Sequence, residues 1–243
     1  MIRLPEEQDP LLGRPFAVLD RILENGQPVG IEFGYHVVGK LTRQLPQLAS
    51  GTQLTLWGPL GNGFPELQVD HLACVAGGIG YTPFVGVSKA ALGISRYTKP
   101  CGNAYELSAQ KVSFLYGGRN ANACADVTIE AEENRFCLQY ATEDGSQGTK
   151  GYVTKLLEDL LNSDAPPQAV FTCGPEVMMQ AVAEICEQAG VDCWVSLETP
   201  MACGFGACFS CVTRIKQEDG SWDYRRSCVE GPVFPGHLMA WEG

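Results

Sequence analysis

The sequence predicts a β + α/β protein in three units, because the residue pattern and composition change at two points along the chain. Residues 67–198 alternate apolar, strand-like runs with helix-length segments, which is typical of a doubly wound parallel sheet with helices on both faces. Residues 1–66 contain short runs that alternate apolar and polar residues between Gly and Pro, and these favour a small antiparallel barrel. Residues 199–243 are rich in Cys, Gly and small residues and show little helix or strand signal, so something other than a large core must hold this unit together.

The individual elements follow from the hydrophobic periodicity, taken in chain order. In the first unit, strands are expected at residues 31–38 and 52–57, and a sheet without any functional site explains this pattern equally well. In the second unit we expect strands at 72–76, 112–116, 136–141, 169–172 and 193–197. The helices between them are expected at 83–95, 122–132, 152–162 and 175–188, with a loop at 98–111.

Composition narrows the classes of protein to which this chain can belong. Its 17 Lys and Arg against 28 Asp and Glu give a formal charge of −11, which argues against nucleic acid or an anionic membrane surface as a partner. The first residues lack the apolar run of a secretory signal peptide, and the longest uncharged run, 72–88, is short for a membrane span. We therefore expect a soluble, cytoplasmic protein whose 11 cysteines are reduced thiols, metal ligands or both.

Four cysteines have the spacing C-x4-C-x2-C followed by a fourth cysteine after 16 residues: Cys203, Cys208, Cys211 and Cys228. This is the plant-type [2Fe-2S] ferredoxin pattern, in which one tight loop supplies three thiolates and a distant turn supplies the fourth. Gly204, Gly206 and Ala207 are small enough to let backbone N–H groups approach the cluster sulfur. A zinc site and unliganded thiols are the alternatives, although zinc sites usually pair their cysteines in two short motifs. The other seven cysteines are scattered and are interpreted mainly as small buried hydrophobic residues.

A glycine turn follows the first predicted strand of the parallel sheet. Gly77, Gly78 and Gly80 precede Thr82 and Pro83, which suit the N-cap and the first position of the next helix. Backbone N–H groups at such a turn can bind a phosphate at a helix N-terminus. A tight turn without a ligand is an equal alternative when the motif is taken alone, because it reads G-x-G-x-x-P.

Two more turns end later strands of the same sheet. One is residues 116–119, which contains Arg119, and the other is residues 172–178, which contains Cys173, Gly174 and Pro175. Each turn alone is most simply an ordinary strand-to-helix connection. Because ligands of open α/β sheets bind at the carboxyl ends of the strands, three such turns together predict a nucleotide crevice.

Taken in order, these motifs resemble those of one family. The order is Arg-Pro-Phe-Ala at 14–17, Gly-Pro-Leu-Gly-Asn-Gly-Phe at 58–64, the three turns, the cysteine loop, and Cys-Val-Glu-Gly-Pro-Val-Phe at 228–234. The chain resembles the iron–sulfur electron-transfer subunit of NAD-linked dihydroorotate dehydrogenase, within the ferredoxin–NADP reductase superfamily. The likeness covers nearly the whole chain.

The resemblance implies that FAD binds between the antiparallel barrel and the nucleotide domain. It then implies contacts with the flavin and its phosphates from three segments: Arg14, Pro15, Phe16 and Ala17; Gly34, Tyr35 and His36; Leu41 and Thr42. On this basis Arg14 pairs with the pyrophosphate, Tyr35 stacks and Thr42 donates to a phosphate. Ala17 stands where a hydroxyl is usual and His36 where an Arg is common, which removes one hydrogen bond and reduces the positive charge at neutral pH.

The resemblance also implies a path for electrons. NADH docks at residues 77–80 and 173–178, and electrons pass through FAD and [2Fe-2S] to an FMN-bearing catalytic subunit that interconverts dihydroorotate and orotate. In pyrimidine biosynthesis the net flow runs to NAD⁺, and two copies of each subunit form a heterotetramer. Cys173 is expected near the nicotinamide or in packing, and Glu198 beside the cluster or simply at the surface. Arg119 stands where an acidic residue would select NADH, so the preference for NADH comes from the resemblance alone.

The start of the chain and the partner stay open at this stage. The barrel of the family has about two further strands before the segment at 14–17, so either the protein begins upstream of Met1, which we favour, or the barrel is reduced and has an open edge. The alternative functions are a NAD(P)H:acceptor reductase subunit that serves another partner, and a cluster-carrying redox sensor without flavin.

Overall fold

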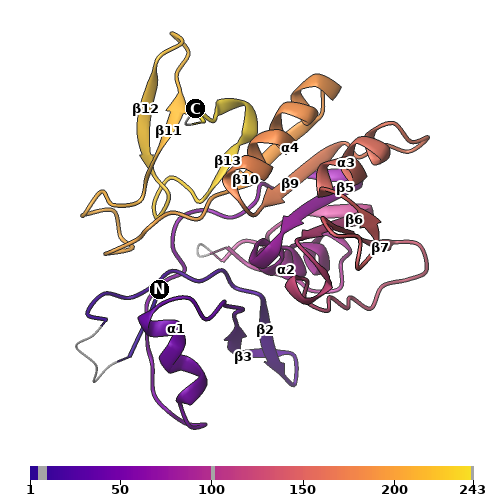
Figure 1. Cartoon of the computed structure of the whole chain (residues 1–243). Helices are drawn as coiled ribbons and strands as arrows, with labels where there is room; N and C mark the ends of the chain where they lie inside the picture. Colours follow the sequence, from indigo (N-terminus) through magenta and orange to yellow (C-terminus); the bar gives the residue numbers. More distant parts are fainter. Residues whose placement is uncertain (5–9, 100–101, 242–243) are drawn as a thin grey trace.

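The computed structural model describes residues 1–4, 10–99 and 102–241, and its largest feature is a seven-stranded sheet (Figure 1). The strands lie in the order β13-β10-β9-β5-β6-β7-β8. Their bounds are β5 (Gln68–Gly77), β6 (Ser108–Gly118), β7 (Phe136–Thr142), β8 (Thr149–Lys150), β9 (Ala169–Cys173), β10 (Asp192–Ser196) and β13 (Val233–Pro235). Every neighbouring pair of strands from β10 to β8 in this order is parallel, which confirms the sheet predicted from the strand–helix alternation.

The sheet is nevertheless mixed rather than wholly parallel. β13 pairs with β10 in antiparallel register, with Val195 opposite Phe234. Both of these side chains are buried, so the pairing contributes to the core. The C-terminal unit thus supplies an edge strand to the nucleotide sheet, although its sequence carries little strand signal.

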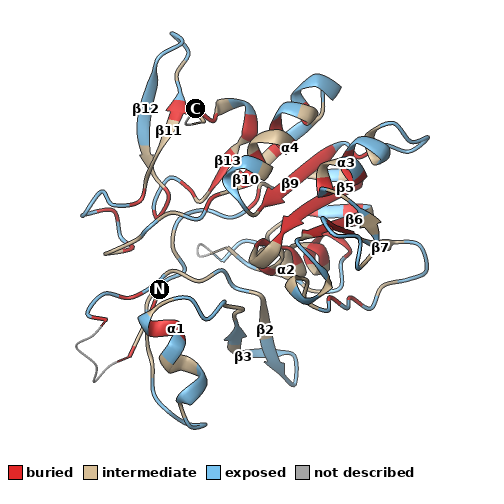
Figure 2. Cartoon of the chain, in the orientation of Figure 1, coloured by how far each residue is buried: buried red, intermediate tan, exposed pale blue. Residues whose placement is uncertain are grey.

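Helices cover both faces of this sheet. All residues of β5 from Leu72 to Ala76 are buried, although alternate side chains point to opposite sides. One face packs against α2 (Thr82–Ala91), and the other packs against α3 (Val153–Leu161) and α4 (Glu176–Ala189). Figure 2 shows the buried residues concentrated in the sheet and on the helix sides that face it. No helix in the described part of the chain is long and apolar enough to cross a membrane.

The helix predicted at 122–132 is wrong. A single 3-10 turn, η3 (Ala121–Ala123), is followed by irregular backbone as far as β7. Val127 and Ile129 are buried against the core, whereas Thr128 between them is exposed. This alternation is the burial pattern of an extended chain, and the β-branched run of Val, Thr and Ile favours it over a helix.

The described residues before 67 form two small antiparallel sheets and a short helix, where we predicted an antiparallel barrel that lacks its first strands (Figure 1). The elements are β1 (Ile2–Arg3), β2 (Asp20–Glu24), β3 (Gln27–Glu32), α1 (Lys40–Gln44), η1 (Leu45–Gln47) and β4 (Thr55–Leu56). β1 pairs with β4, and β2 pairs with β3. The strand predicted at 31–38 overlaps β3 only at residues 31 and 32, and the strand predicted at 52–57 is shortened to Thr55–Leu56. β2 and β3 pair only with each other among the described residues, and apolar side chains such as Val29 and Ile31 remain exposed.

The N-terminal unit is attached to the nucleotide unit through β2. The carboxylate of Asp20 forms an ion pair with Lys89 of α2 and accepts a hydrogen bond from the Tyr97 hydroxyl at 3.3 Å. The Arg21 guanidinium lies 3.9 Å from the centroid of the Tyr97 ring. These contacts hold the β2–β3 hairpin against α2.

The C-terminal unit contains a hairpin that the sequence analysis missed. It consists of β11 (Val212–Lys216) and β12 (Trp222–Arg226), and a 3-10 turn, η4 (Gly236–Leu238), follows β13. The signal was present in Asp219-Gly220, because Gly220 has a φ of +83° in the turn that joins the two strands. The cysteine loop lies just before this hairpin.

His71 should make folding sensitive to mild acid. It is 4% exposed, its Nδ1 donates to the Ala165 carbonyl at 2.8 Å, and its Nε2 accepts from the Ser113 hydroxyl at 2.8 Å. Burial, with a smaller contribution from Lys111, lowers the pKa of His71. The unfolded chain therefore binds a proton more readily than the folded one, so stability falls as the pH drops through about 6.5 and is unaffected by His71 above that value.

The measurement is urea unfolding of the wild type and of His71→Gln at pH 7.5 and pH 5.5. The loss attributable to His71 is expected to stay below about 1.4 kcal/mol per pH unit, which is the limit for one proton. An equal loss on acidification in both proteins would refute this role of His71.

Candidate functional site

The three glycine turns predicted from the sequence lie at one edge of the sheet, at the carboxyl ends of β5, β6 and β9. β5 and β9 are adjacent, with Ala76 opposite Cys173, whereas β6 lies on the other side of β5. The strand order therefore reverses between β5 and β9. Ligands of open α/β sheets bind at such a switch point, so the geometry of this edge suits a nucleotide.

Glycines at this edge allow two turns to touch. A Cβ on Gly80 would lie 2.2 Å from the carbonyl oxygen of Cys173. Gly174 has a φ of +155°, and its Cβ would lie 2.9 Å from the backbone nitrogen of Gly77. Gly78 differs, because it has a φ of +55° and faces open space. Gly77, Gly80 and Gly174 therefore allow the two turns to come into contact, whereas Gly78 leaves its backbone accessible to a ligand.

The turn after β6 is explained by packing. A Cβ on Gly117 would lie 2.9 Å from the Val153 Cβ, and one on Gly118 would lie 2.6 Å from the Cys124 Sγ. These two glycines therefore let α3 and the segment after η3 approach the strand. Arg119, the next residue, is exposed.

Thr82 does not cap α2, which corrects the sequence prediction. The helix begins at Thr82 itself, directly after the 3-10 turn η2 (Gly78–Tyr81), and the Thr82 hydroxyl donates to the Ile79 carbonyl at 3.0 Å. The buried Thr82 side chain instead faces the N-terminal unit. A Cβ on Gly34 would lie 2.9 Å from Thr82 Cγ2 and 3.4 Å from the Tyr81 hydroxyl. The segment expected to bind flavin thus lies against the turn expected to bind nucleotide.

Cys173 is a neutral thiol in this site. Burial, with a smaller contribution from the charge of Glu198, raises the pKa of Cys173 to about 12. The side chain is 4% exposed and its backbone closes against Gly80. The Cys173 side chain is thus packed beside the turn, and the negative charge of the exposed Glu198 acts on its thiol. Pro175 is the N-cap residue of α4.

Three aromatic rings gather in the segment expected to contact the flavin. Phe16 lies 5.1 Å from Phe33 and 6.2 Å from Tyr35, measured between ring centroids. The Arg14 side chain is exposed, and its Nη1 donates to two carbonyls of the preceding turn at 2.9 and 3.1 Å. An aromatic surface and an accessible guanidinium are compatible with an isoalloxazine ring and a phosphate.

Thr42 and Leu41 have local structural contacts. The Thr42 Oγ1 accepts hydrogen bonds from the backbone N–H groups of Val38 at 3.0 Å and Gly39 at 2.9 Å. Leu41 is 2% exposed and anchors α1. The remaining residues expected at the flavin are at the surface or close to it: Pro15, Ala17 and His36.

The four cysteines of the loop lie in two pairs. Cys211 and Cys228 are buried, and their Sγ atoms are 3.2 Å apart. Cys203 and Cys208 interact through their side chains and are more exposed. Within the described ranges, no three His, Cys, Asp or Glu side chains converge on a single metal ion. Two pairs of thiols can supply two thiolates to each of two irons, so the arrangement fits a two-iron cluster.

Hydrogen-bond donors surround these thiols. The Phe205 N–H lies 3.5 Å from the Cys203 Sγ and contributes most to lowering the pKa of Cys203. The Ser210 hydroxyl, 3.2 Å from the Cys208 Sγ, is the main group that lowers the pKa of Cys208 to about 6. Burial raises the pKa of Cys228 to about 11. The donors at the exposed pair favour thiolates, which are the form that binds iron.

Arg226 fastens the loop, and the sequence analysis did not single it out. Its Nη1 donates to the Gly206 carbonyl at 3.1 Å, and its Nε and Nη2 donate to the Glu230 carboxylate at 3.1 and 2.6 Å. The guanidinium also lies 5.1 Å from the centroid of the Phe209 ring. The hydrogen bond from Arg226 lowers the pKa of Glu230 to about 2, so this ion pair persists at neutral pH.

Asn62 joins the N-terminal unit to the C-terminal unit. Its Nδ2 donates to the carbonyls of Glu230 at 3.1 Å and Val233 at 2.9 Å, and its Oδ1 accepts from the Val233 N–H at 2.9 Å. Gly61, with a φ of +66°, lies directly against Gly231. A Cβ on Gly61 would lie 1.9 Å from the carbonyl oxygen of Gly231. The two motifs at 58–64 and 228–234 are thus one contact in the folded chain.

Replacing Asn62 with Ala should destabilise this junction by about 2–3 kcal/mol, because it leaves two carbonyls and one N–H group without partners. Urea unfolding measures the effect. The exposed Asn122, replaced by Ala, is the control and should change stability by less than about 0.5 kcal/mol. Equal urea midpoints for the two variants would contradict the assignment.

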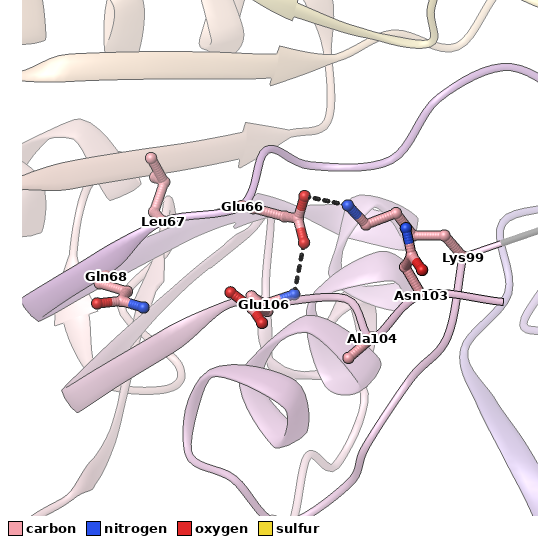
Figure 3. A pocket seen from close by; sticks show the side chains of 7 residues that line it. All are labelled: Glu66, Leu67, Gln68, Lys99, Asn103, Ala104 and Glu106. Carbon is pink, nitrogen blue, oxygen red and sulfur yellow. Dashed lines mark hydrogen bonds and ion pairs between the residues drawn. The ribbon is translucent and has the colours of Figure 1, made fainter. Parts of the chain in front are cut away.

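A polar hollow of about 530 Å³ lies away from this site, at the amino ends of β5 and β6 (Figure 3). Glu66 forms an ion pair with Lys99 and accepts a hydrogen bond from the Glu106 N–H at 2.7 Å. Because the glycine turns are at the carboxyl ends of these strands, the hollow is not the predicted nucleotide crevice.

Two family models match the chain. One, described as "Iron-sulfur cluster binding domain of dihydroorotate dehydrogenase B", matches residues 198–240 and includes the four cysteines of the loop. The other, described as "Oxidoreductase NAD-binding domain", matches residues 74–184 and includes the turns after β5 and β9. These matches and the geometry above define an iron–sulfur oxidoreductase with a nucleotide-binding sheet.

Curated relatives narrow the class to one family. The "Dihydroorotate dehydrogenase B (NAD(+)), electron transfer subunit" of Clostridium acetobutylicum is 37% identical over 231 residues, which cover 94% of this chain and 79% of that protein. The protein of the same description from Desulforamulus reducens is 35% identical over 244 residues, which cover 99% of this chain and 85% of that protein. The chain belongs to the family of dihydroorotate dehydrogenase B electron transfer subunits.

Solved structures agree on the fold. An NADH-dependent reduced ferredoxin–NADP oxidoreductase, studied for flavin-based electron bifurcation, superposes with a TM-score of 0.67 at 26% identity, over 94% of this chain and 80% of that chain. The ferredoxin reductase of carbazole 1,9a-dioxygenase superposes with a TM-score of 0.57 at 20% identity, over 78% and 55% of the two chains. The fold is therefore ferredoxin reductase-like.

Proposed function

We propose that this subunit transfers electrons between NAD and an FMN-containing dihydroorotate dehydrogenase subunit, through FAD and a [2Fe-2S] cluster, in pyrimidine biosynthesis. The observation that carries the proposal is that one chain combines two features. Its four loop cysteines lie in two pairs, 203/208 and 211/228, and the strand order of its sheet reverses beside the accessible Gly78. The bound cofactors supply the chemistry, which is hydride exchange between NAD and flavin and single-electron exchange with the cluster.

NAD would be held at the carboxyl ends of β5 and β9. The accessible Gly78 backbone presents N–H groups to a phosphate, and Gly77, Gly80 and Gly174 let the two turns close beneath it. Burial keeps the Cys173 thiol neutral, so it would present no negative charge to the nucleotide beside this turn.

FAD would lie between the N-terminal unit and this edge. Phe16 and Tyr35 supply apolar ring surface, Arg14 supplies charge, and Gly34 lets the segment approach Thr82. Thr42 holds the N–H groups of the preceding turn in place, so its role is positioning more than direct donation. We also propose that the chain divides functionally at 66 and 198, with β13 returning to the central sheet.

The cluster would be bound by all four cysteines. Arg226 and Glu230 fix the loop backbone, and the N–H of Phe205 and the hydroxyl of Ser210 stabilise the outer thiolates. Phe205 and Phe209 are 69% and 61% exposed beside the cysteines, so this side of the unit is accessible to a partner subunit. We propose two copies of each subunit in the assembled enzyme.

The test is the cofactor content of the purified chain and its behaviour with NADH. We expect iron and sulfide near two per chain, one FAD, and bleaching of the flavin band on addition of NADH. Co-expression with an FMN-containing barrel dehydrogenase should yield a complex that reduces NAD⁺ with dihydroorotate. Iron without flavin would favour a redox sensor, zinc would overturn the cluster, and activity only with another acceptor would favour a general NAD(P)H reductase.

A further inference from the structure

The indole of Trp57 lies where three separate segments meet. Trp57 follows β4, and its Nε1–H donates to the carbonyl oxygen of Cys203 at 3.0 Å. The next residue in the cysteine loop, Gly204, has a φ of +79°, and a Cβ there would lie 3.1 Å from the same indole nitrogen. The ring is therefore in direct contact with the first cysteine segment of the loop.

The other end of the indole is held by the segment that precedes Arg14. A Cβ on the buried Gly13 would lie 2.3 Å from Trp57 Cη2 and 3.0 Å from Cζ2, so only glycine leaves room for the ring. Gly13 does not have a left-handed φ, so its lack of a side chain is explained by close contacts, the tightest of which is the one with Trp57.

The backbone around Trp57 is fixed as well. Its carbonyl accepts a hydrogen bond from the amino group of Met1 at 3.1 Å, and its N–H donates to the Met1 carbonyl at 3.2 Å. Arg14 exchanges two backbone hydrogen bonds with Ile2, each of 2.9 Å. The ring therefore spans two anchored segments, with its nitrogen on the cysteine loop and its distal edge on Gly13.

We propose that Trp57 is a positioning residue that couples the segment at 13–17 to the cysteine loop and raises the reduction potential of the cluster bound there. This inference rests on the proposed function, because it takes the cluster as bound by Cys203. Indole N–H is a donor only, and it points toward the loop through the Cys203 carbonyl. By polarising the Cys203 peptide, this donor would draw electron density away from the thiolate of that residue, which stabilises the added negative charge of the reduced form.

The first test is Trp57→Phe in the full chain, which keeps an aromatic ring and removes the N–H. The readout is a potentiometric titration of the cluster followed by electron paramagnetic resonance. At a fixed applied potential the ratio of reduced to oxidised cluster should fall, by at most about fivefold, which is the limit if one net hydrogen bond were made only in the reduced state. Trp222→Phe, on the exposed hairpin strand β12, is the control and should leave this ratio unchanged.

The second test approaches the same contact from the other side. Gly13→Ala should displace the ring and lower the ratio in the same direction, whereas Gly63→Ala, which meets open space, should not. In the double variant Gly13→Ala with Trp57→Phe, the ratio should equal that of Trp57→Phe alone, because both changes break one contact.

The outcomes separate this inference from the proposed function. A wild-type chain without iron and sulfide would overturn the proposed function. Two results would overturn the role of Trp57 and leave the proposed function standing. One is a cluster that titrates identically in the loaded wild type and in Trp57→Phe. The other is a double variant in which the effects of the two single changes add.

Discussion

Replacing Cys211 with Ser is expected to reduce the iron and sulfide content of the chain to less than about a tenth of the wild-type value, because a serine hydroxyl does not ionise as a thiol does and binds iron poorly. Cys211 is the natural position to change, since it is 2% exposed and its Sγ lies 3.2 Å from the Sγ of Cys228. Serine is close to it in size, so loss of the ligand should outweigh any loss of packing. Iron and acid-labile sulfide analysis measures the result.

The control for this prediction is Cys137→Ser. Cys137 lies in β7, is partly buried, and belongs to the nucleotide sheet rather than to the loop. Its replacement should leave iron and sulfide at the wild-type level. Full iron content in the Cys211 variant would mean that the metal is held elsewhere, and the two-pair arrangement would then have no bearing on it.

Parallel strands were predictable from sequence because both of their faces are buried. The residues at 72–76 form an uninterrupted apolar run, and each side chain has a covered face to enter. Helix ends were predictable to within a few residues where a glycine or a proline marks them, as at α4, which ends before Gly190 with its φ of +68°. Thr82 shows the limit, because a 3-10 turn before the helix moved the start by one residue.

Prediction failed where tertiary contact, and not local pattern, decides the structure. The segment at 122–132 has the length of a helix, but burial of Val127 and Ile129 holds it extended. β13 has three residues and becomes a strand because β10 offers it an edge. β1 likewise has two residues and becomes a strand because β4 and Arg14 pair with it.

The residues of the candidate site also differ in whether local sequence could predict them. Cysteine spacing is local, so the four candidate ligands could be proposed from sequence, and the turn glycines could be proposed from their place after strands. Trp57, Asn62 and Arg226 could not, because their partners are fixed only by the fold. The bond from Trp57 to the Cys203 carbonyl spans 146 positions, and that from Asn62 to the Val233 carbonyl spans 171. Trp57 and Arg226 carry no motif, and the role of Asn62, although it lies in the motif at 58–64, follows only from the assembled fold.

Replacing Gly80 with Ala is the second change expected to have a large effect. The new Cβ would lie 2.2 Å from the carbonyl oxygen of Cys173 and 2.7 Å from the backbone nitrogen of Gly174, and both are backbone atoms that cannot rotate away. The turns after β5 and β9 must then separate at the switch point of the sheet. We expect a loss of about 3 kcal/mol in the free energy of unfolding, at the upper end for overpacking, and at least about tenfold weaker NAD binding.

Urea unfolding and titration with NADH measure the two effects, with Gly63→Ala as the control because a Cβ there meets nothing within 4 Å. Gly80 has no left-handed φ, so alanine at this position tests the contact and not the backbone conformation. If the turns served packing alone, the variant would be less stable but would bind NADH normally once folded. If stability and NADH affinity both stay at the wild-type values, the turns do not touch as described, and the nucleotide crevice must be sought at another edge of the sheet.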